Sequence, residues 1–135
     1  MLGKGSARLR SDGPESSRAN DSTIEAGDIA AMRASFSDDA EIWHNTDELV
    51  VTPDQTAQTL TGMVARIKHI AYADRRLTAF PGGFVQQHVL TGRRIHDDAA
   101  VRLPCAIICK VEQGLITRLD EYFDSAHVAT FRKYA

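Results

Sequence analysis

Residues 101–123, VRLPCAIICKVEQGLITRLDEYF, decide the fold of this chain. They predict a strand from Val101 to Val111, a tight turn over residues 112–114 and a second strand from Leu115 to Phe123. Side chains of a strand alternate between two faces. One face of the second strand carries Leu115, Thr117, Leu119, Glu121 and Phe123, and the other carries Ile116, Arg118, Asp120, Tyr122 and Asp124. The stretch therefore predicts an antiparallel hairpin with one largely apolar face.

Glu121 is the main candidate for chemistry because it lies between Leu119 and Phe123 on that apolar face. A carboxylate in such a place is either paired with a basic or hydroxyl neighbour or withdrawn from water. A desolvated carboxyl group suits proton transfer. Both interpretations stay open from the residues alone.

Length and composition indicate one ordinary globular domain. The 135 residues are 43% hydrophobic and 25% charged, with a formal net charge of -2, which argues against a nucleic-acid partner. No run of about 18 apolar residues predicts a membrane span, and no apolar segment follows the basic residues near the N-terminus. We therefore expect a cytoplasmic protein with neither a nucleic-acid nor a membrane partner.

The two cysteines fit that expectation. Cys105 and Cys109 share one face of the same strand, about 13 Å apart, which is too far for a disulfide. They read as small buried residues with free thiols. No ligand spacing around them predicts a zinc site, so neither a metal nor a cofactor is expected.

The rest of the chain adds helices before the hairpin. Residues 1–18 predict a flexible N-terminal tail, and residues 19–135 a single domain. Short helices are expected over Glu15–Ala26 and, after the N-cap Asp28, over Ile29–Phe36. A turn at residues 37–40 then leads into a short strand, Glu41–Asn45.

The best helix signal lies at Thr52-Pro53-Asp54-Gln55, which combines an N-cap, a proline at the first position and a capping-box glutamine. The helix after it is amphipathic, with an inward face predicted to continue to residue 71 through Leu60, Met63, Val64, Ile67, Ile70 and Ala71.

Strands Arg75–Phe80 and Phe84–Arg93 precede the final hairpin, and a helix over Ser125–Arg132 ends the chain. This order predicts an α+β fold: a cone-shaped, curved, antiparallel or mixed sheet with helices packed on its concave face and a cavity between them.

Several motifs of the chain resemble SnoaL-like domains of the nuclear transport factor 2-like (ketosteroid isomerase-like) superfamily. They are Ala26-Gly27-Asp28, residues 37–40 followed by Ile42-Trp43-His44-Asn45, Gly114–Arg118, and Glu121–Asp124. The resemblance covers residues 24–132 and implies the cone-shaped fold. It does not choose among the isomerases, polyketide cyclases, epoxide hydrolases, dehydratases and binding domains of that superfamily.

Individual positions depart from the best-known members. Ketosteroid isomerases place the Asp that acts as their general base where this chain has His44, and their oxyanion-hole Asp corresponds to Ala106. Their oxyanion-hole Tyr has no counterpart on the N-terminal helix, so the resemblance does not imply steroid-type enolisation in that form. Limonene-epoxide hydrolases hold a water molecule with a Tyr, an Asn and an Asp, which correspond to Trp43, Asn45 and Glu121. Their Arg and Asp pair is missing, which leaves His88 as the candidate acid.

SnoaL-type cyclases use an acid and a histidine, which Glu121 and either His44 or His88 would supply. His88 shares a strand face with Phe84, Gln86 and Leu90, where it would pair with Glu121 or act as the acid, or else be a satisfied core histidine. Because alternation separates it from Trp43 and Asn45, His44 is expected at the surface or in a turn.

The leading hypothesis is a cofactor-free, metal-free enzyme that isomerises, cyclises or hydrolyses a small apolar organic ligand. Glu121 and His88 are its candidate catalytic residues. The candidate substrate-binding residues are Trp43, Asn45, Met63, Leu119 and Phe123. The alternative is a non-catalytic domain for ligand binding or dimerisation. A homodimer is expected to pair through the outer face of the sheet, where Arg118, Asp120 and Tyr122 lie.

Overall fold

The computed structural model describes residues 2–135, with side chains from Gly13 onward. Its elements in chain order are α1 (Leu2–Glu25), α2 (Ile29–Ala34), β1 (Phe36–His44), β2 (Val50–Val51), α3 (Pro53–Arg66), β3 (Ile67–Phe80), β4 (Gly83–Arg94), β5 (Ala100–Glu112), β6 (Leu115–Phe123) and α4 (Ser125–Arg132). Within these described residues, no helix has the length and apolar character needed to cross a membrane.

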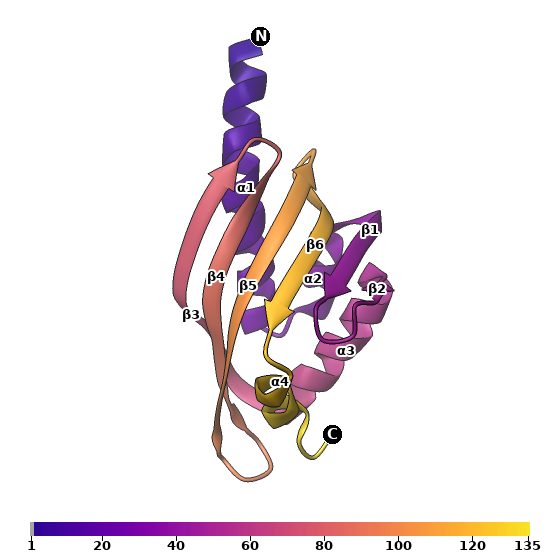
Figure 1. Ribbon diagram of the computed structural model, residues 1–135, viewed down its shortest axis with the longest axis vertical. Helices are drawn as coiled ribbons and strands as arrows, with labels where there is room; N and C mark the ends of the chain where they lie inside the picture. The colour runs from indigo at the N-terminus through magenta and orange to yellow at the C-terminus, as the bar shows by residue number, and fades with distance from the viewer. Residues whose placement is uncertain (1) are drawn as a thin grey trace.

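The six strands form one mixed sheet in the order β2-β1-β6-β5-β4-β3. Only the β1–β6 pair is parallel, and it brings the first and last strands of the chain side by side. Helices α1, α2 and α3 lie on one face of the sheet, while α4 lies at one end (Figure 1). This α+β arrangement has the cone shape predicted from the sequence.

Two bulges in β3 help to curve the sheet. The β3–β4 register shifts between Lys68 and Ala71 and again between Ala73 and Arg76. Each shift contains a residue with positive φ, His69 at 57° and Asp74 at 52°. A bulge inserts an unpaired residue and bends its strand, so β3 wraps around the concave side.

The core lies between the concave face and the helices. Fully buried side chains come from every layer, including Met32 on α2, Ile42 on β1, Phe84 on β4 and Ile116 on β6. Gly83 lies in this tight packing, because a Cβ there would stand 2.1 Å from the carbonyl oxygen of Cys109. Both cysteines are buried free thiols, as the sequence predicts.

Helix α3 begins as predicted and ends earlier than predicted. Thr52 accepts from the backbone N–H of Gln55, and the Gln55 side chain accepts from the backbone N–H of Thr52, which completes the capping box. The helix stops at Arg66, and Ile67 pairs with Arg94 as the first residue of β3. Ile67 is buried in the strand as it would be in a helix, so its apolar character did not distinguish the two.

Two other predictions are wrong. Residues 37–40 belong to β1 and are not a turn, and β1 ends at His44, so Asn45 follows the strand. Residues 13–18 of the expected tail lie in α1, where Ser16 and Ser17 are buried. The helix predicted over Glu15–Ala26 is therefore part of a longer one, and the polar side chains through which it packs could not be recognised from an apolar pattern. The side chains of the preceding residues lie outside the described part.

Candidate active site

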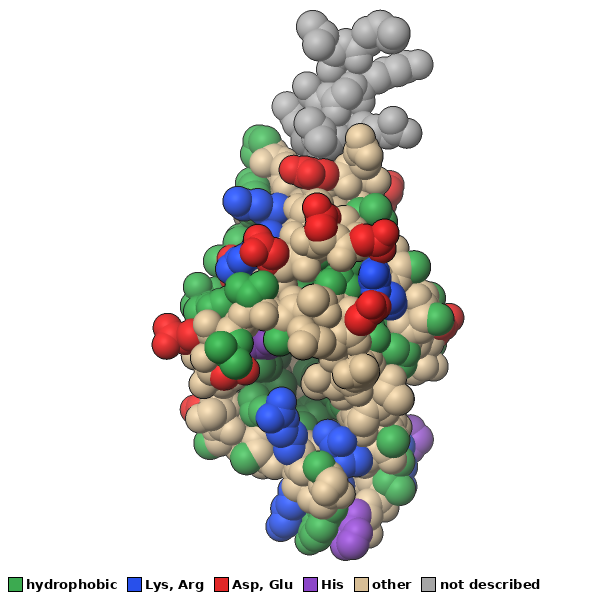
Figure 2. All heavy atoms as spheres, turned by 90° about the vertical axis from the view of Figure 1, so that its right-hand side faces the viewer, with side chains coloured by type: hydrophobic (Ala, Val, Ile, Leu, Met, Phe, Trp, Pro, Cys, Tyr) green, Lys and Arg blue, Asp and Glu red, His purple; other side chains and the backbone are tan. Residues whose placement is uncertain are grey.

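A cavity of about 530 Å³ opens between the concave face of the sheet and the helices. Most of its wall is apolar, with Met63 from α3, Leu90 from β4, and Leu119 and Phe123 from β6 among the contributors. Figure 2 shows the hollow with hydrophobic side chains inside it, a histidine on its wall and two basic side chains at its edge. The arginines that line the cavity are Arg66 and Arg132.

Titratable side chains interrupt the apolar wall of the cavity. Those on the helices and strands that form the cone include Asp21 on α1, His44 on β1, Tyr72 on β3, His88 on β4 and Glu121 on β6. Five groups of this kind, carried by five elements, are brought together only by the folded cone. Such a set of convergent polar groups in an apolar pocket is the usual mark of a ligand site.

Glu121 pairs with His44 on the cavity wall. The parallel β1–β6 register sets the two residues side by side, and Nε2 of His44 lies 3.2 Å from Oε1 of Glu121. The imidazole ring also stacks on Phe123, with 5.5 Å between ring centroids. Burial lowers the pKa of His44, but the hydrogen bond and charge of Glu121 outweigh it, so the net pKa is raised. The expectation that His44 is a surface or turn residue is therefore wrong.

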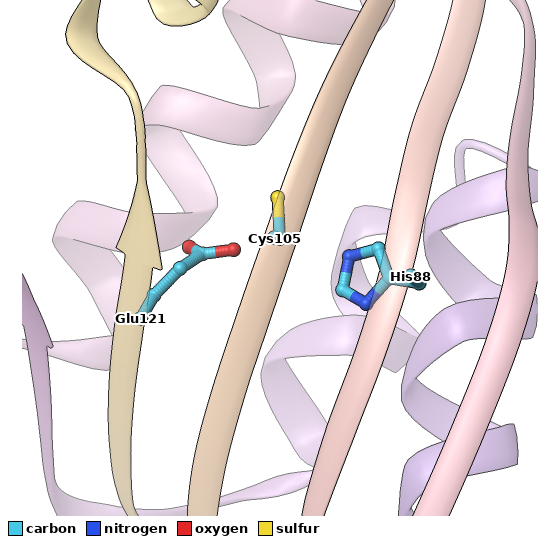
Figure 3. Close-up of side chains that lie close together, drawn as sticks. All are labelled: His88, Cys105 and Glu121. Atoms are coloured by element: carbon cyan, nitrogen blue, oxygen red, sulfur yellow. The ribbon is translucent and has the colours of Figure 1, made fainter.

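His88, Cys105 and Glu121 point into the same space (Figure 3). His88 pairs directly with Cys105 in the β4–β5 register, and one nitrogen, sulfur or oxygen atom of each of the three side chains lies within 4.8 Å of the others. Imidazole, thiolate and carboxylate are zinc ligands. However, burial and the nearby Glu121 raise the pKa of the Cys105 thiol, whose Sγ lies 3.3 Å from the carbonyl oxygen of Leu103. The thiol therefore stays protonated unless a metal displaces its proton.

A polar network extends from His88 to α1. The fully buried Gln86 places Nε2 at 2.9 Å from Nδ1 of His88 and at 3.5 Å from Oδ1 of Asp21. Its Oε1 accepts hydrogen bonds from the Ser17 hydroxyl and from Nε of Arg75. Arg75 in turn donates to Ser17 through Nη2 at 2.7 Å. Helix α1 is thus joined to the sheet by hydrogen bonds that end on a cavity histidine.

Burial strongly perturbs the carboxyl group of Asp21. Its Oδ2 lies 2.6 Å from Nε of Arg75 but makes no well-aligned hydrogen bond with any described residue, since the Nε–H is directed to Gln86. Burial therefore outweighs the attraction of Arg75 and raises the pKa of Asp21 to about 6. A carboxyl group of that kind exchanges protons close to neutral pH.

Tyr72 contributes a protonated phenol. Its ring centroid lies 4.7 Å from that of His88, and burial raises the pKa of Tyr72 well above its usual value. The phenol is therefore a hydrogen-bond donor on the wall.

Five of the predicted site residues line the cavity: Met63, His88, Leu119, Glu121 and Phe123. Trp43 and Asn45 do not. Trp43 packs edge-on against Tyr122 with 5.4 Å between ring centroids, and Tyr122 belongs to the outer face. Asn45 follows β1 and accepts a hydrogen bond from the backbone N–H of Phe123 through Oδ1. The structure thus places both residues outside the cavity wall, and their contact with a substrate stays a prediction.

Titratable cavity residues outside the predicted catalytic and substrate-binding set include His44, Asp21 and Tyr72. A signal for His44 was present, because alternation places it with the apolar Ala40 and Ile42 and places Trp43 with the charged Glu41. Asp21 also follows helical spacing from Ser17 to Ile24, but a polar face is not recognisable as a buried one. No sequence signal points to Tyr72.

Comparisons with known proteins agree with this architecture. The family model described as SnoaL-like domain matches residues 18–119. A search of curated proteins found no matching sequence. Among solved structures, a hypothetical protein with a ketosteroid isomerase-like fold from Catenulispora acidiphila, in complex with trimethylamine, gives a TM-score of 0.76 at 14% identity, covering 91% of this chain and 95% of that chain.

Two further solved structures are similar. A "putative polyketide cyclase" from Xanthomonas campestris gives a TM-score of 0.75 at 21% identity and covers 90% of this chain and 97% of that chain. An LEH-like epoxide hydrolase from M. tuberculosis gives a TM-score of 0.71 at 17% identity, with 90% of each chain covered. At these identities the likeness shows a shared fold.

Proposed function

This chain belongs to the SnoaL-like domain family, and on that premise we propose that it is an enzyme that uses acid–base chemistry on a small apolar organic substrate. The reaction is an isomerisation, a cyclisation or an epoxide hydrolysis. All three need a base that removes a proton from carbon or water and a donor that stabilises charge on oxygen. No cofactor takes part in the proposed chemistry.

The observation that carries this proposal is the Glu121–His44 pair on the wall of a mostly apolar cavity. The raised pKa of His44 favours an imidazolium next to the Glu121 side chain, so that a cation and a base adjoin on the cavity wall. The apolar wall formed by Met63, Leu119 and Phe123 holds the substrate body and excludes water. Glu121 is thus the proposed base, and His44 its partner.

His88 is the proposed group that interacts with the substrate oxygen. It faces the same space as Glu121 from two strands away. A substrate bound between them would place its oxygen atom against the donor His88 and the proton to be removed against the base Glu121. The similar structures described as a putative polyketide cyclase and an epoxide hydrolase support chemistry of this kind without selecting one reaction.

Glu121→Gln tests the proposal, with Glu41→Gln as its matched control. Glu41 is an exposed glutamate on the outer face of β1, so its neutralisation leaves the cavity unchanged. The wild type is incubated with cyclic ketones in D₂O, where NMR reports exchange at the α-carbon, and with cyclic epoxides in ¹⁸O-labelled water, where mass spectrometry reports diol formation. We expect turnover in one of the two panels, and a loss of about 100-fold or more in Glu121→Gln.

The control and the stability measurement separate chemistry from folding. Glu41→Gln should retain wild-type turnover, and Glu121→Gln should unfold within about 1 kcal/mol of the wild type because its ion pair is partly exposed. Full turnover in Glu121→Gln, or unfolding of that variant by several kcal/mol, would contradict the proposed role and indicate a structural ion pair.

The competing function is a non-catalytic domain for ligand binding or dimerisation. It is favoured by the outer face of the sheet, where Tyr122 is 44% exposed and Ile108 is 40% exposed. A second hollow, lined by Pro104, Ala106 and Tyr122 among others, lies on this face. If ligands bind to the cavity but no substrate in either panel is turned over, this binding function replaces the enzymatic one.

A further inference from the structure

Gln86 occupies a position that determines which nitrogen of His88 carries a proton. Its side chain is fully buried between α1 and the sheet and has polar partners at both ends. Its oxygen accepts hydrogen bonds from the Ser17 hydroxyl and from Nε of Arg75, the second at 3.3 Å. At the nitrogen end are Oδ1 of Asp21 at 3.5 Å and Nδ1 of His88 at 2.9 Å.

These partners allow only one orientation of the amide. A guanidinium group has donors and no acceptor, so the carbonyl oxygen of Gln86 must face Arg75. Turning the amide over would set its NH₂ group against Arg75 and its oxygen against the Asp21 side chain. The NH₂ group therefore faces His88, and Nδ1 of His88 must accept with a lone pair.

The ring of His88 is neutral in this environment. Burial lowers the pKa of His88; Glu121 opposes this effect, and the charge of Arg75 adds to it, with a lowered pKa as the net result. A neutral imidazole carries one proton, and because Nδ1 is an acceptor that proton is on Nε2. The ring is directed at the space shared with Cys105 and Glu121 (Figure 3).

We propose that Gln86 is a positioning residue that holds His88 as a neutral Nε2–H donor, so that the deep end of the cavity binds a hydrogen-bond acceptor oxygen of the ligand. Carbonyl and epoxide oxygens are the matching ligand chemistry, and this assignment of substrate class rests on the proposed function. The tautomer itself does not depend on turnover. His88 then polarises the oxygen as a donor and does not transfer a proton as an imidazolium would.

The same argument bears on zinc. His88, Cys105 and Glu121 could hold the ion only if Nε2 offered a lone pair, which requires Nδ1 to be protonated and to face an acceptor. Gln86 presents a donor there, and its oxygen is already held by Arg75 and Ser17. The donor tautomer and a zinc site are therefore mutually exclusive, which makes the proposal open to a direct test.

The first test reads the tautomer in the full chain. Protein labelled with ¹⁵N-histidine is examined at about pH 7.5 by long-range ¹H–¹⁵N correlation NMR, which distinguishes the two neutral tautomers and the imidazolium. We expect an unprotonated Nδ1 and a protonated Nε2 for His88, unchanged when equimolar Zn²⁺ is added. An Nδ1–H tautomer, an imidazolium or a shift of the His88 signals by Zn²⁺ would overturn the proposal.

Substitutions then test whether Gln86 causes the tautomer. Gln86→Glu replaces the donor with an acceptor and should move the proton to Nδ1 or produce the imidazolium. Gln87→Glu is the matched control, because Gln87 is exposed on the opposite face of β4. Gln86→Met keeps similar volume without a donor and avoids a buried charge, and it should leave a mixture of tautomers. A fully retained Nε2–H tautomer in Gln86→Met would show that Gln86 does not set it.

The ligand class is tested by binding of decalone, a bicyclic ketone, and of methylenedecalin, in which C=CH₂ replaces the carbonyl. The ratio of the two dissociation constants cancels the shared apolar contribution. Binding is measured at a pH where NMR shows the His88 ring of Gln86→Glu as the neutral Nδ1–H tautomer, because an imidazolium would still donate through Nε2. There we expect the preference for the ketone to fall about fivefold to tenfold in Gln86→Glu and to stay unchanged in Gln87→Glu. An unchanged ratio in Gln86→Glu would refute the acceptor-oxygen site, whereas failure of the enzyme proposal would appear only as absent turnover.

Discussion

Neutralising Asp21 should stabilise the protein at neutral pH. Asp21 is only 4% exposed, and burial raises its pKa from 3.8 to about 6. That rise corresponds to about 3 kcal/mol by which the folded state disfavours the ionised group relative to the unfolded chain. Asp21→Asn resembles the protonated carboxyl in shape and charge, so it should relieve most of this cost.

The sign of the pH dependence follows from the same shift. Between pH 3.8 and about 6 the folded protein holds a proton that the unfolded chain has lost, so the contribution of Asp21 to stability falls as pH rises through this window. Below the window both states are protonated and the cost vanishes. The variant should therefore gain about 3 kcal/mol over the wild type at pH 7.5 and less than about 1 kcal/mol at pH 4.

Urea unfolding of both proteins at the two pH values measures this difference from the midpoints, provided that the slopes agree. Asp39→Asn is the matched control, because Asp39 is an exposed aspartate on β1. That variant should follow the wild type at both pH values. If Asp21→Asn is instead less stable than the wild type at pH 7.5, the ion pair with Arg75 outweighs desolvation and the reasoning fails.

Three other predictions concern the cavity wall. In Glu121→Gln, NMR titration should show that the pKa of His44 falls below its raised wild-type value. In the wild type, the stabilisation from the His44–Glu121 pair is present below about pH 6.5 and is lost as pH rises through the raised pKa of His44 in the folded state. Trp43→Phe should leave the dissociation constant for decalone unchanged, and a large change would place Trp43 back in the site. Met63→Ala should cost about 2–4 kcal/mol in urea unfolding, because Met63 is buried both in the core and against the cavity, and a loss below about 1 kcal/mol would contradict that packing.

The hairpins were predictable from sequence because local signals agree there. Strands β4, β5 and β6 alternate with a period of two and are joined by glycine-containing or charged turns, and their registers run without interruption over most of their length. The orientation of Glu121 follows from this alternation. The capping box at Thr52 was equally local, and its two hydrogen bonds are present.

The residues that escaped prediction depend on contacts between distant segments. His44 reaches Glu121 only through the parallel β1–β6 pairing, which places the first strand of the chain beside the last. Asp21 and Ser17 face the cavity side of α1 because they meet Gln86 and Arg75, which lie more than fifty residues away. A polar helix face reads as solvated until its partners are known. The sequence therefore predicts the apolar wall better than the polar groups that interrupt it.

Asp21 and Glu121, two of the acids that line the cavity, share one physical arrangement. Each has a basic partner supplied by another element: His44 on β1 for Glu121 on β6, and Arg75 on β3 for Asp21 on α1. Each pairing is incomplete, since Oδ2 of Asp21 lacks a well-aligned donor and His44 meets Glu121 through one nitrogen at 3.2 Å. A fully satisfied carboxylate would be stable and unreactive, whereas a partly satisfied one in an apolar cavity retains the capacity to exchange a proton with a ligand. The closure of the cone that brings these elements together thus also leaves both carboxyl groups incompletely paired.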